Sequence, residues 1–341
     1  MTVLEKMFGS HDDNLEPPKP ASDMKEVLDA LAALGGKPIE SLTAEEARKQ
    51  PTPTEAVKRV LGQKGKPPTD DMGVMAHDIV IPGAAGDLPA RVFRPEGTEN
   101  ETLPVIVYWH GGGWVIANID VYDGGPRALA KMAHAVVVSC HYRQAPEHKF
   151  PAAHDDAFAQ YQWVRGNTGV FSSNGAQIAV AGESAGANLA INVAIAARDA
   201  GIDAPVHMAL VYPVAGNDMN TPSYRQNADA KPLNKAMMEW FVKQTFASVS
   251  ETADPRINLV AAELKNLPSA TIVLAEIDPL RSEGEALAKR LKEAGSDVDY
   301  KIYDGVTHEF FGMGAVVGDA KSAEKMMAGG LKKAFGTDTL I

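Results

Sequence analysis

The chain has 341 residues, a formal net charge of −11 and 45% hydrophobic residues. This length and balance are typical of a globular protein with a full core, and they exclude a collagen-like or largely disordered chain. The sequence is acidic and contains no long cluster of lysine or arginine, which argues against nucleic acid or an anionic membrane as a standing partner. The charge therefore favours a neutral or cationic small-molecule substrate.

The start of the sequence and its single cysteine indicate where the protein works. The first residues lack the basic start and the apolar stretch of a signal peptide, and no later stretch is long and apolar enough to span a bilayer. Cys140 ends an apolar run, so we expect a buried thiol, no intrachain disulfide and no cysteine-based metal cluster. We expect a cytoplasmic protein without stable membrane association.

Residues 1 to about 70 differ in composition from the rest of the chain. Prolines at 17–18, 51 and 53 separate short helical segments, such as the one from Met24 to Leu34. Thr43 and Glu46 have the spacing of a capping box, in which each side chain bonds the other residue's amide at the start of a helix. We expect a helical appendage over residues 1–70, followed by the main domain over 71–341.

From about residue 76 onward, apolar runs of strand length alternate with helical stretches. This rhythm predicts a mostly parallel sheet of about eight strands with helices on both faces. The Gly-containing link at 83–86 leaves no room for a crossover helix, so we expect the first two strands to form an antiparallel hairpin at one edge. The expected strands are 77–82, 90–93, 105–109, 136–140, 178–181, 208–212, 272–275 and 298–303. The expected helices are 124–133, 153–165, 185–199 and 282–294, the last with a capping box at Ser282 and Glu285.

A long excursion at about 213–270 separates two of these strands and contains an amphipathic segment at 234–244. Insertions at the C-terminal ends of parallel strands lie over the active-site crevice, so this segment is a candidate lid. Met237, Met238 and Phe241 on it are candidate pocket residues. Packing of the same apolar face into an ordinary core is nearly as good an explanation for each of them.

The most specific motif is G-x-S-x-G at 182–186, placed where a short apolar strand turns into an alanine-rich helix. Gly182 and Gly186 allow strand and helix to approach closely, and the sharp turn exposes the hydroxyl of Ser184. The N-terminus of the helix points unpaired amides at the place where an oxyanion would develop. Ser184 is therefore the candidate nucleophile.

A serine hydroxyl needs a histidine base, which in turn needs a carboxylate that orients it. In α/β-hydrolases the acid and then the histidine follow the serine along the chain. Of the nine histidines, only His207 and His308 follow Ser184. His207 begins the next strand, too early for an acid to lie between, so His308, on a loop past the last strand, is the candidate base.

The acid is expected just after the penultimate strand, at the same edge of the sheet as the base. Asp278 occupies that place, and Glu276 at the end of the strand is the alternative. Asp304 is too close to His308 in sequence to be preferred, because a separate loop orients the ring better.

The motif H-G-G-G at 110–113 follows a predicted strand and precedes the nucleophile. Glycines let the backbone turn its amides toward a substrate, and although a lone triplet is usually a flexible turn, this position favours an oxyanion loop. We expect the amides of Gly111, Gly112 and Ala185 to bind the oxyanion. Trp114 is a candidate for the pocket wall, and packing against neighbouring helices would explain it equally well.

Five motifs occur in a fixed order over roughly residues 75 to 335. They are H-G-G-G at 110–113, Y-R-Q-A-P-E at 142–147 followed by F-P-A-A at 150–153, G-E-S-A-G-A-N-L at 182–189, D-P-L-R at 278–281 and G-V-T-H at 305–308. In this combination the sequence resembles the bacterial hormone-sensitive-lipase-like carboxylesterases.

The resemblance implies an α/β-hydrolase fold with a helical cap, built from the N-terminal helices and the insertion at about 213–270. It also implies hydrolysis of short-chain acyl esters without metal or cofactor, and frequent homodimers. An acyltransferase, an amidase or a deacetylase would use the same triad and acyl-enzyme. A non-catalytic ligand-binding homologue is a less favoured alternative, because serine, acid and histidine are all present.

Three positions depart from the usual pattern of that family. Glu183 stands where aspartate or threonine is common, Tyr122 where a histidine often follows the oxyanion loop, and Glu309 where glycine is frequent. We expect none of the three to touch the triad. For Glu183 we favour a side chain that points behind the elbow and anchors neighbouring loops over one that tunes the nucleophile.

Overall fold

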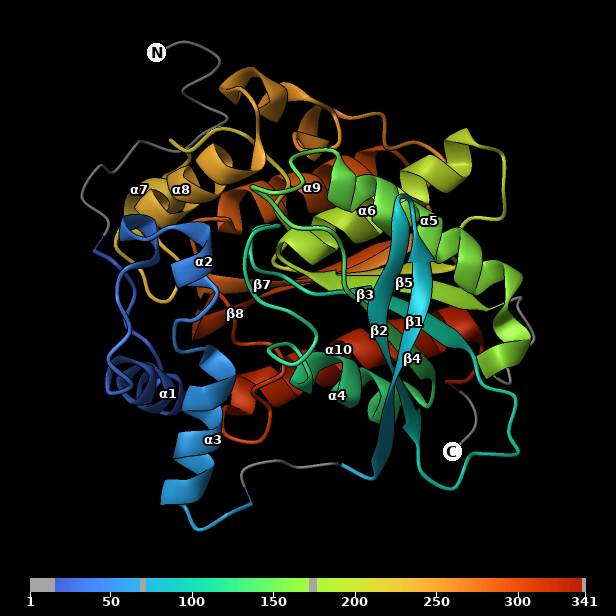
Figure 1. Cartoon of the computed structure of the whole chain (residues 1–341), viewed down its shortest axis with the longest axis horizontal. Helices are drawn as coiled ribbons and strands as arrows, with labels where there is room; N and C mark the ends of the chain where they lie inside the picture. Colours follow the sequence, from blue (N-terminus) through green and yellow to red (C-terminus); the bar gives the residue numbers. More distant parts are fainter. Residues whose placement is uncertain (1–15, 68–71, 172–176, 339–341) are drawn as a thin grey trace.

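The computed structural model describes residues 16–67, 72–171 and 177–338, so residues 1–15 and 68–70 of the expected N-terminal appendage lie outside the described residues. One eight-stranded sheet forms the centre, with helices on both of its faces (Figure 1). The predicted α/β-hydrolase fold is therefore confirmed.

The elements follow the predicted order along the chain. The strands are β1 Val74–Gly83, β2 Gly86–Pro95, β3 Val105–Trp109, β4 Val136–Cys140, β5 Ile178–Glu183, β6 His207–Val211, β7 Ser269–Ile277 and β8 Val298–Thr307. The helices are α1 Ser22–Ala32, α2 Ala44–Ala47, α3 Pro53–Gln63, α4 Gly124–Ala133, α5 Ala152–Gly166, α6 Ala185–Asp199, α7 Pro222–Gln226, α8 Lys235–Thr245, α9 Arg281–Glu293 and α10 Gly318–Phe335.

The sheet has the order β1-β2-β4-β3-β5-β6-β7-β8. Strand β2 is antiparallel to both β1 and β4, and all other neighbours are parallel. Gly83 pairs with Gly86 across the turn of the first two strands, which confirms the predicted hairpin at one edge. Because the parallel strands run side by side, the segments that follow β3, β5, β7 and β8 meet at one edge of the sheet.

Apolar side chains are buried on both faces of the sheet. Every residue of β3, β4 and β6 is buried, as expected for strands covered on two sides. Helices α5, α6 and α9 pack on one face, and α4 and α10 pack on the other (Figure 1). Cys140 lies in the first of these cores, as expected.

Helix α10 was not among the predicted helices, because two consecutive glycines interrupt its pattern. Gly330 explains the interruption, since a Cβ atom there would lie 2.0 Å from Oγ1 of Thr271 in β7. A glycine at this point lets the helix approach the sheet closely.

One of the two predicted capping boxes forms. Thr43 and Glu46 exchange both hydrogen bonds at the start of α2, as predicted. The box predicted at Ser282 and Glu285 is wrong, because α9 begins one residue earlier with Leu280 at the N-cap position. The hydroxyl of Ser282 instead accepts a hydrogen bond at 3.1 Å from the amide of Ser223 in α7.

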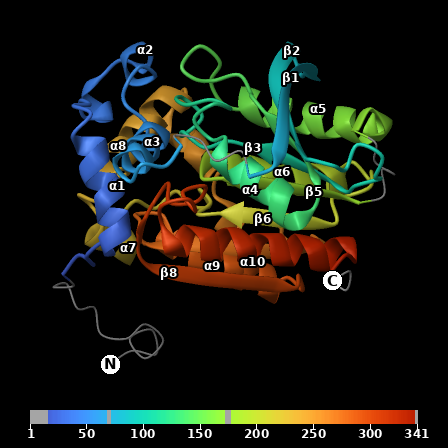
Figure 2. The same cartoon turned by 90° about the horizontal axis from the view of Figure 1, so that it is seen from below.

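The N-terminal helices and the 213–270 excursion lie together at one end of the sheet (Figure 2). Trp240 of α8 donates a hydrogen bond of 3.0 Å from Nε1 to the carbonyl oxygen of Leu42, which joins the two segments. Arg48 ties the N-terminal segment to the main domain, because it donates to the carbonyls of Val115 and Ala145 at 2.8 Å each. Among the described residues, no helix is long and apolar enough to cross a membrane.

A buried ion pair fixes the loop between β4 and α5. Asp156 has no exposed surface and accepts hydrogen bonds from Nε and Nη2 of Arg143, from the backbone amide of Arg143 and from that of Ala84. Four donors converge on this carboxylate, so its role is structural.

Asp156→Ala should lower the free energy of unfolding by about 3 kcal/mol, because it leaves these donors without a partner. Asp155→Ala, one residue earlier and exposed, is the matched control and should change stability by less than about 0.5 kcal/mol. Urea unfolding of both variants at one pH measures the difference. Equal effects would show that the Arg143 cluster does not stabilise the fold.

Candidate active site

The turn between β5 and α6 holds Ser184 in an unusual backbone conformation, with φ 55° and ψ −116°. The turn is tight enough that a Cβ on Gly186 would lie 1.9 Å from the carbonyl oxygen of Trp109, and one on Gly182 would lie 2.3 Å from that of Gly186. Only glycine fits at either position. The amide of Ser184 donates to the carbonyl of Val211 at 2.9 Å, which fixes the elbow to β6.

His308 and Asp278 meet beside this turn, each from the end of a neighbouring strand. Nδ1 of His308 lies 2.7 Å from Oδ2 of Asp278, and both side chains are almost fully buried. Burial by itself lowers the pKa of His308, but the negative charge of Asp278 and its hydrogen bond raise it above the ordinary 6.5. The ring also packs on Tyr212, with 4.3 Å between ring centroids.

The alternative acid and the other histidine make different contacts. Oε2 of Glu276 accepts a hydrogen bond of 2.7 Å from the amide of Gly305, so this carboxylate holds the loop that leads to His308. His207 lies at the start of β6, where its ring nitrogens contact the hydroxyls of Ser269 and Thr271. The structure therefore brings Asp278 to His308, and it gives Glu276 and His207 other partners.

Ser184 and His308 line the same cavity. Among the hydrogen bonds of the described residues, none joins the hydroxyl of Ser184 to His308. Such bonds are often long before substrate binds, so the geometry is compatible with a proton transfer between them.

The glycine loop after β3 turns back sharply beside Ser184. Gly112 has φ 94°, and a Cβ there would lie 2.2 Å from the carbonyl oxygen of Ile116. Within the described part of the chain, the amides of Gly111, Gly112 and Ala185 donate to no other protein atom. These are the three donors predicted for the oxyanion.

His110 belongs to the support of this loop. Its ring is fully buried, stacks on Tyr142 at 4.5 Å between centroids and contacts Nδ1 of His141 at 3.0 Å. The hydroxyl of Tyr142 donates to the carbonyls of His110 and Gly111 at 2.9 and 3.1 Å. Burial lowers the pKa of His110 to about 3, so the ring is neutral at physiological pH.

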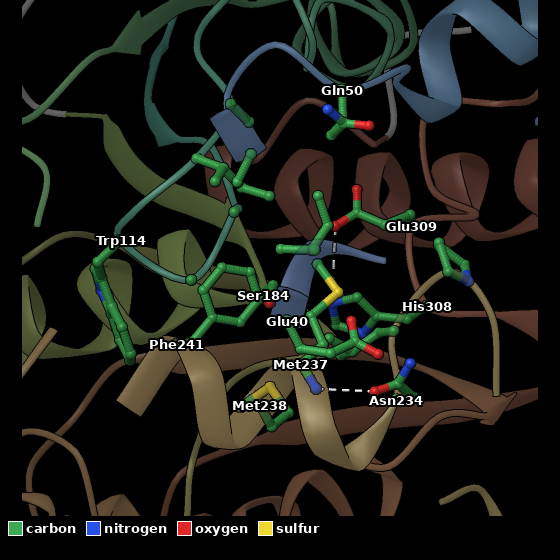
Figure 3. A pocket seen from close by; sticks show the side chains of 18 of the residues that line it. Glu40, Gln50, Trp114, Ser184, Asn234, Met237, Met238, Phe241, His308 and Glu309 are labelled. Atoms are coloured by element: carbon green, nitrogen blue, oxygen red, sulfur yellow. Dashed lines mark hydrogen bonds and ion pairs between the residues drawn. The ribbon is translucent and has the colours of Figure 1, made fainter. Parts of the chain in front are cut away.

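A cavity of about 800 Å³ lies above these groups, between the main domain and the two segments at the end of the sheet. Trp114, Met237, Met238 and Phe241, the predicted pocket residues, all line it (Figure 3). Phe241 packs directly on the glycine loop, because a Cβ on Gly113 would lie 2.3 Å from its ring.

Two of the three positions that depart from the family pattern also line the cavity. Oε1 of Glu309 lies 3.9 Å from Nε2 of His308, and it accepts a hydrogen bond of 2.6 Å from the hydroxyl of Tyr122. The expectation that none of the three would touch the triad is therefore wrong for Glu309. Its sequence position directly after the base was the signal that could have identified it.

Glu183 lies behind the elbow, as expected. It is almost fully buried and accepts hydrogen bonds from the hydroxyls of Tyr108 and Tyr212. Burial raises its pKa to about 8, so the carboxyl is largely protonated at neutral pH. Among the described residues, no group of three or more histidine, cysteine, aspartate or glutamate side chains is arranged to hold a metal ion.

Comparison with known proteins gives a consistent set of matches. A family model described as the alpha/beta hydrolase fold matches residues 106–312. Carboxylesterase NlhH of Mycobacterium tuberculosis is 38% identical over 253 residues, which cover 73% of this chain and 79% of that protein. Ethyl acetate hydrolase of Pseudomonas putida is 30% identical over 300 residues, which cover 87% and 92% of the two chains.

The structure is also similar to solved esterase structures. The hyperthermophilic esterase from the archaeon Pyrobaculum calidifontis superposes with a TM-score of 0.82 at 34% sequence identity, covering 93% of this chain and 98% of that chain. The match includes most of the described residues, so it extends beyond the core that the family model covers.

Proposed function

The chain belongs to the α/β-hydrolase fold family, among its hormone-sensitive-lipase-like carboxylesterases, and we propose that Ser184, His308 and Asp278 carry out its ester hydrolysis. The observation that carries this proposal is the 2.7 Å contact between His308 and Asp278. The ring of His308 lines the same cavity as the strained Ser184 (Figure 3). Relatives named for ester hydrolysis support this activity over the acyltransferase, amidase and deacetylase alternatives.

Acylation begins when the hydroxyl oxygen of Ser184 attacks the ester carbonyl carbon. Nε2 of His308 takes the hydroxyl proton, while Asp278 holds Nδ1–H and stabilises the imidazolium. The carbonyl oxygen becomes an oxyanion that the amides of Gly111, Gly112 and Ala185 bind. Collapse of this intermediate breaks the bond to the alcohol, which leaves with the proton from His308.

Deacylation repeats these steps with water as the nucleophile. His308 takes a proton from the water as its oxygen attacks the acyl carbon, and the same amides bind the second oxyanion. The bond to Ser184 then breaks, the proton passes to the serine oxygen and the carboxylic acid leaves.

The cavity favours a small, neutral, largely apolar ester. Its volume of about 800 Å³ lies within the range of small-molecule sites, and side chains such as Phe241 and Met238 narrow it above Ser184. We place the N-terminal helices and the 213–270 excursion together as a cap that limits the acyl chain to short lengths. The cytoplasmic location and the homodimer expected from the sequence and the resemblance remain predictions.

Ser184→Ala should lower kcat for p-nitrophenyl acetate by about 10⁴-fold or more, since the covalent route is lost. Ser139→Ala is the matched control, because Ser139 is also buried and its hydroxyl has no hydrogen-bond partner among the described residues. This control should keep wild-type turnover. A fluorophosphonate probe should label the wild type and Ser139→Ala only. Near-normal turnover by Ser184→Ala would contradict the assignment.

Asp278→Asn should reduce kcat/KM by about 10⁴-fold, and its residual activity should extend to lower pH than that of the wild type. The neutral form of His308 is the base, so wild-type kcat/KM should fall as pH drops through a pKa above 6.5. Asp278 raises this pKa more than Glu309 does, so loss of its charge should move the acid limb of the profile to lower pH. Glu276→Gln is the control, and a larger loss there than in Asp278→Asn would mean that Glu276 is the acid.

A series of p-nitrophenyl esters from acetyl to dodecanoyl tests the proposed cap. We expect kcat/KM to peak sharply at short acyl chains and Phe241→Ala to move the peak to longer ones, because it removes an aromatic wall next to Gly113. Lys243→Ala, exposed on the same helix, should leave the profile unchanged. Wild-type activity that rises toward the longest esters would refute a closed pocket.

A further inference from the structure

Two side chains that depart from the family pattern are hydrogen-bonded to each other beside the triad. The hydroxyl of Tyr122, just before α4, donates to Oε1 of Glu309, just after β8, at 2.6 Å. The two positions are 187 residues apart in sequence. Tyr122 also lies against the oxyanion loop, because a Cβ on Gly111 would lie 2.4 Å from its hydroxyl.

Glu309 faces the nitrogen of His308 that performs the proton transfers. Asp278 holds Nδ1, and Oε1 of Glu309 lies 3.9 Å from Nε2 (Figure 3). The imidazole therefore has a carboxyl group on the side of each nitrogen. Glu309 and His308 both line the cavity, so a substrate or a water molecule can reach the space between them.

The backbone conformation at Glu309 is one that favours glycine, yet this position carries a glutamate. Its φ is 73°, a left-handed conformation that glycine adopts freely and other residues adopt under strain. Burial adds a second penalty, because it raises the pKa of this carboxyl. Such strain persists where the side chain has a task in the site.

We propose that Glu309, held by Tyr122, positions the water that hydrolyses the acyl-enzyme. The proposal rests on the acyl-enzyme at Ser184 described above. A separation of 3.9 Å is too long for a direct hydrogen bond between Nε2 and Oε1, but one water molecule can bridge the two atoms. A carboxylate oxygen has two lone pairs, so Oε1 accepts from both Tyr122 and the water.

In this arrangement the water directs one hydrogen to His308 and the other to Glu309. When the water oxygen attacks the acyl carbon, its first proton moves to Nε2 and then to the oxygen of Ser184 as the acyl bond breaks. Glu309 keeps the second hydrogen as a hydrogen bond and exchanges no proton. Acylation uses no water, so the positioning of water by Glu309 acts on deacylation alone.

Glu309→Gly tests the proposal, because glycine suits the backbone conformation and the fold should stay intact. With p-nitrophenyl acetate, kcat should fall about tenfold, KM should fall by the same factor and kcat/KM should stay at the wild-type value. Stopped-flow traces should show a burst of p-nitrophenol, and mass spectrometry should find acetyl groups on Ser184. The loss of that acetyl group after removal of substrate should also be about tenfold slower than in the wild type.

Two further variants distinguish a role of Glu309 in positioning water from a role in stabilising the fold. Glu309→Gln keeps a side-chain oxygen that can accept from water, and it should restore most of kcat. Tyr122→Phe removes the hydroxyl that holds Glu309 and should show a smaller effect of the same kind. The melting temperature of Glu309→Gly should equal or exceed that of the wild type, since the strain at φ 73° is relieved.

Equal losses of kcat and kcat/KM in Glu309→Gly, without acetyl-Ser184, would overturn the proposal and assign Glu309 to acylation or to the fold. A wild-type rate of acetyl loss would overturn it as well. Both results leave the triad intact if Ser184 is still labelled by a fluorophosphonate. Acetyl groups absent from Ser184 in every variant, with full turnover in Ser184→Ala, would instead reject the nucleophile itself.

Discussion

The close approach of β3, β5 and helix α6 at Ser184 is the constraint on which the site depends. The carbonyl oxygen of Trp109 occupies the space that a side chain on Gly186 would need, so the first turn of the helix fits only with glycine at this position. Behind the turn, the carboxyl of Glu183 accepts the hydroxyls of Tyr108 and Tyr212 and links three strands. The proposed nucleophile is therefore held mainly by the sheet, and the amide of Val214, at the start of the excursion, adds a hydrogen bond of 3.3 Å to the carbonyl of Ser184.

Asp278 contributes both to the site and to the fold, because its two carboxylate oxygens have different partners. Its Oδ2 contacts His308, and its Oδ1 accepts the amide of Leu280 at 2.8 Å, at the start of α9. One carboxylate thus orients the proposed base and satisfies an amide that the helix start would leave unpaired. Both oxygens of this fully buried carboxylate therefore have a hydrogen-bond partner.

The sequence predicted the sheet, and it also indicated the proposed triad and oxyanion loop, because each depends on local patterns. Fully buried strands have unbroken apolar runs, and G-x-S-x-G at a strand-to-helix turn is specific once an acid and a histidine follow it. Helix α10 was not predicted, because the glycine at 330 is explained only by a close contact with Thr271 of β7, which the sequence does not show. The contact between Tyr122 and Glu309 was not predicted either. Each of the two residues departs from the family pattern in the sequence, but only the fold brings them together.

Different parts of the chain control reactivity and selectivity. The strand ends hold the proposed nucleophile, base and acid through hydrogen bonds with fixed geometry. The wall above them consists largely of apolar side chains, which limit the volume open to a substrate. The position of that wall depends on a few contacts, namely Phe241 against Gly113, Trp240 with Leu42 and Arg48 with the main domain. Apolar packing of this kind tolerates substitutions of similar volume, whereas the backbone contacts at Gly182 and Gly186 leave no room for a side chain. Changes in substrate preference can therefore accumulate in α8 and the N-terminal helices without disturbing the catalytic geometry.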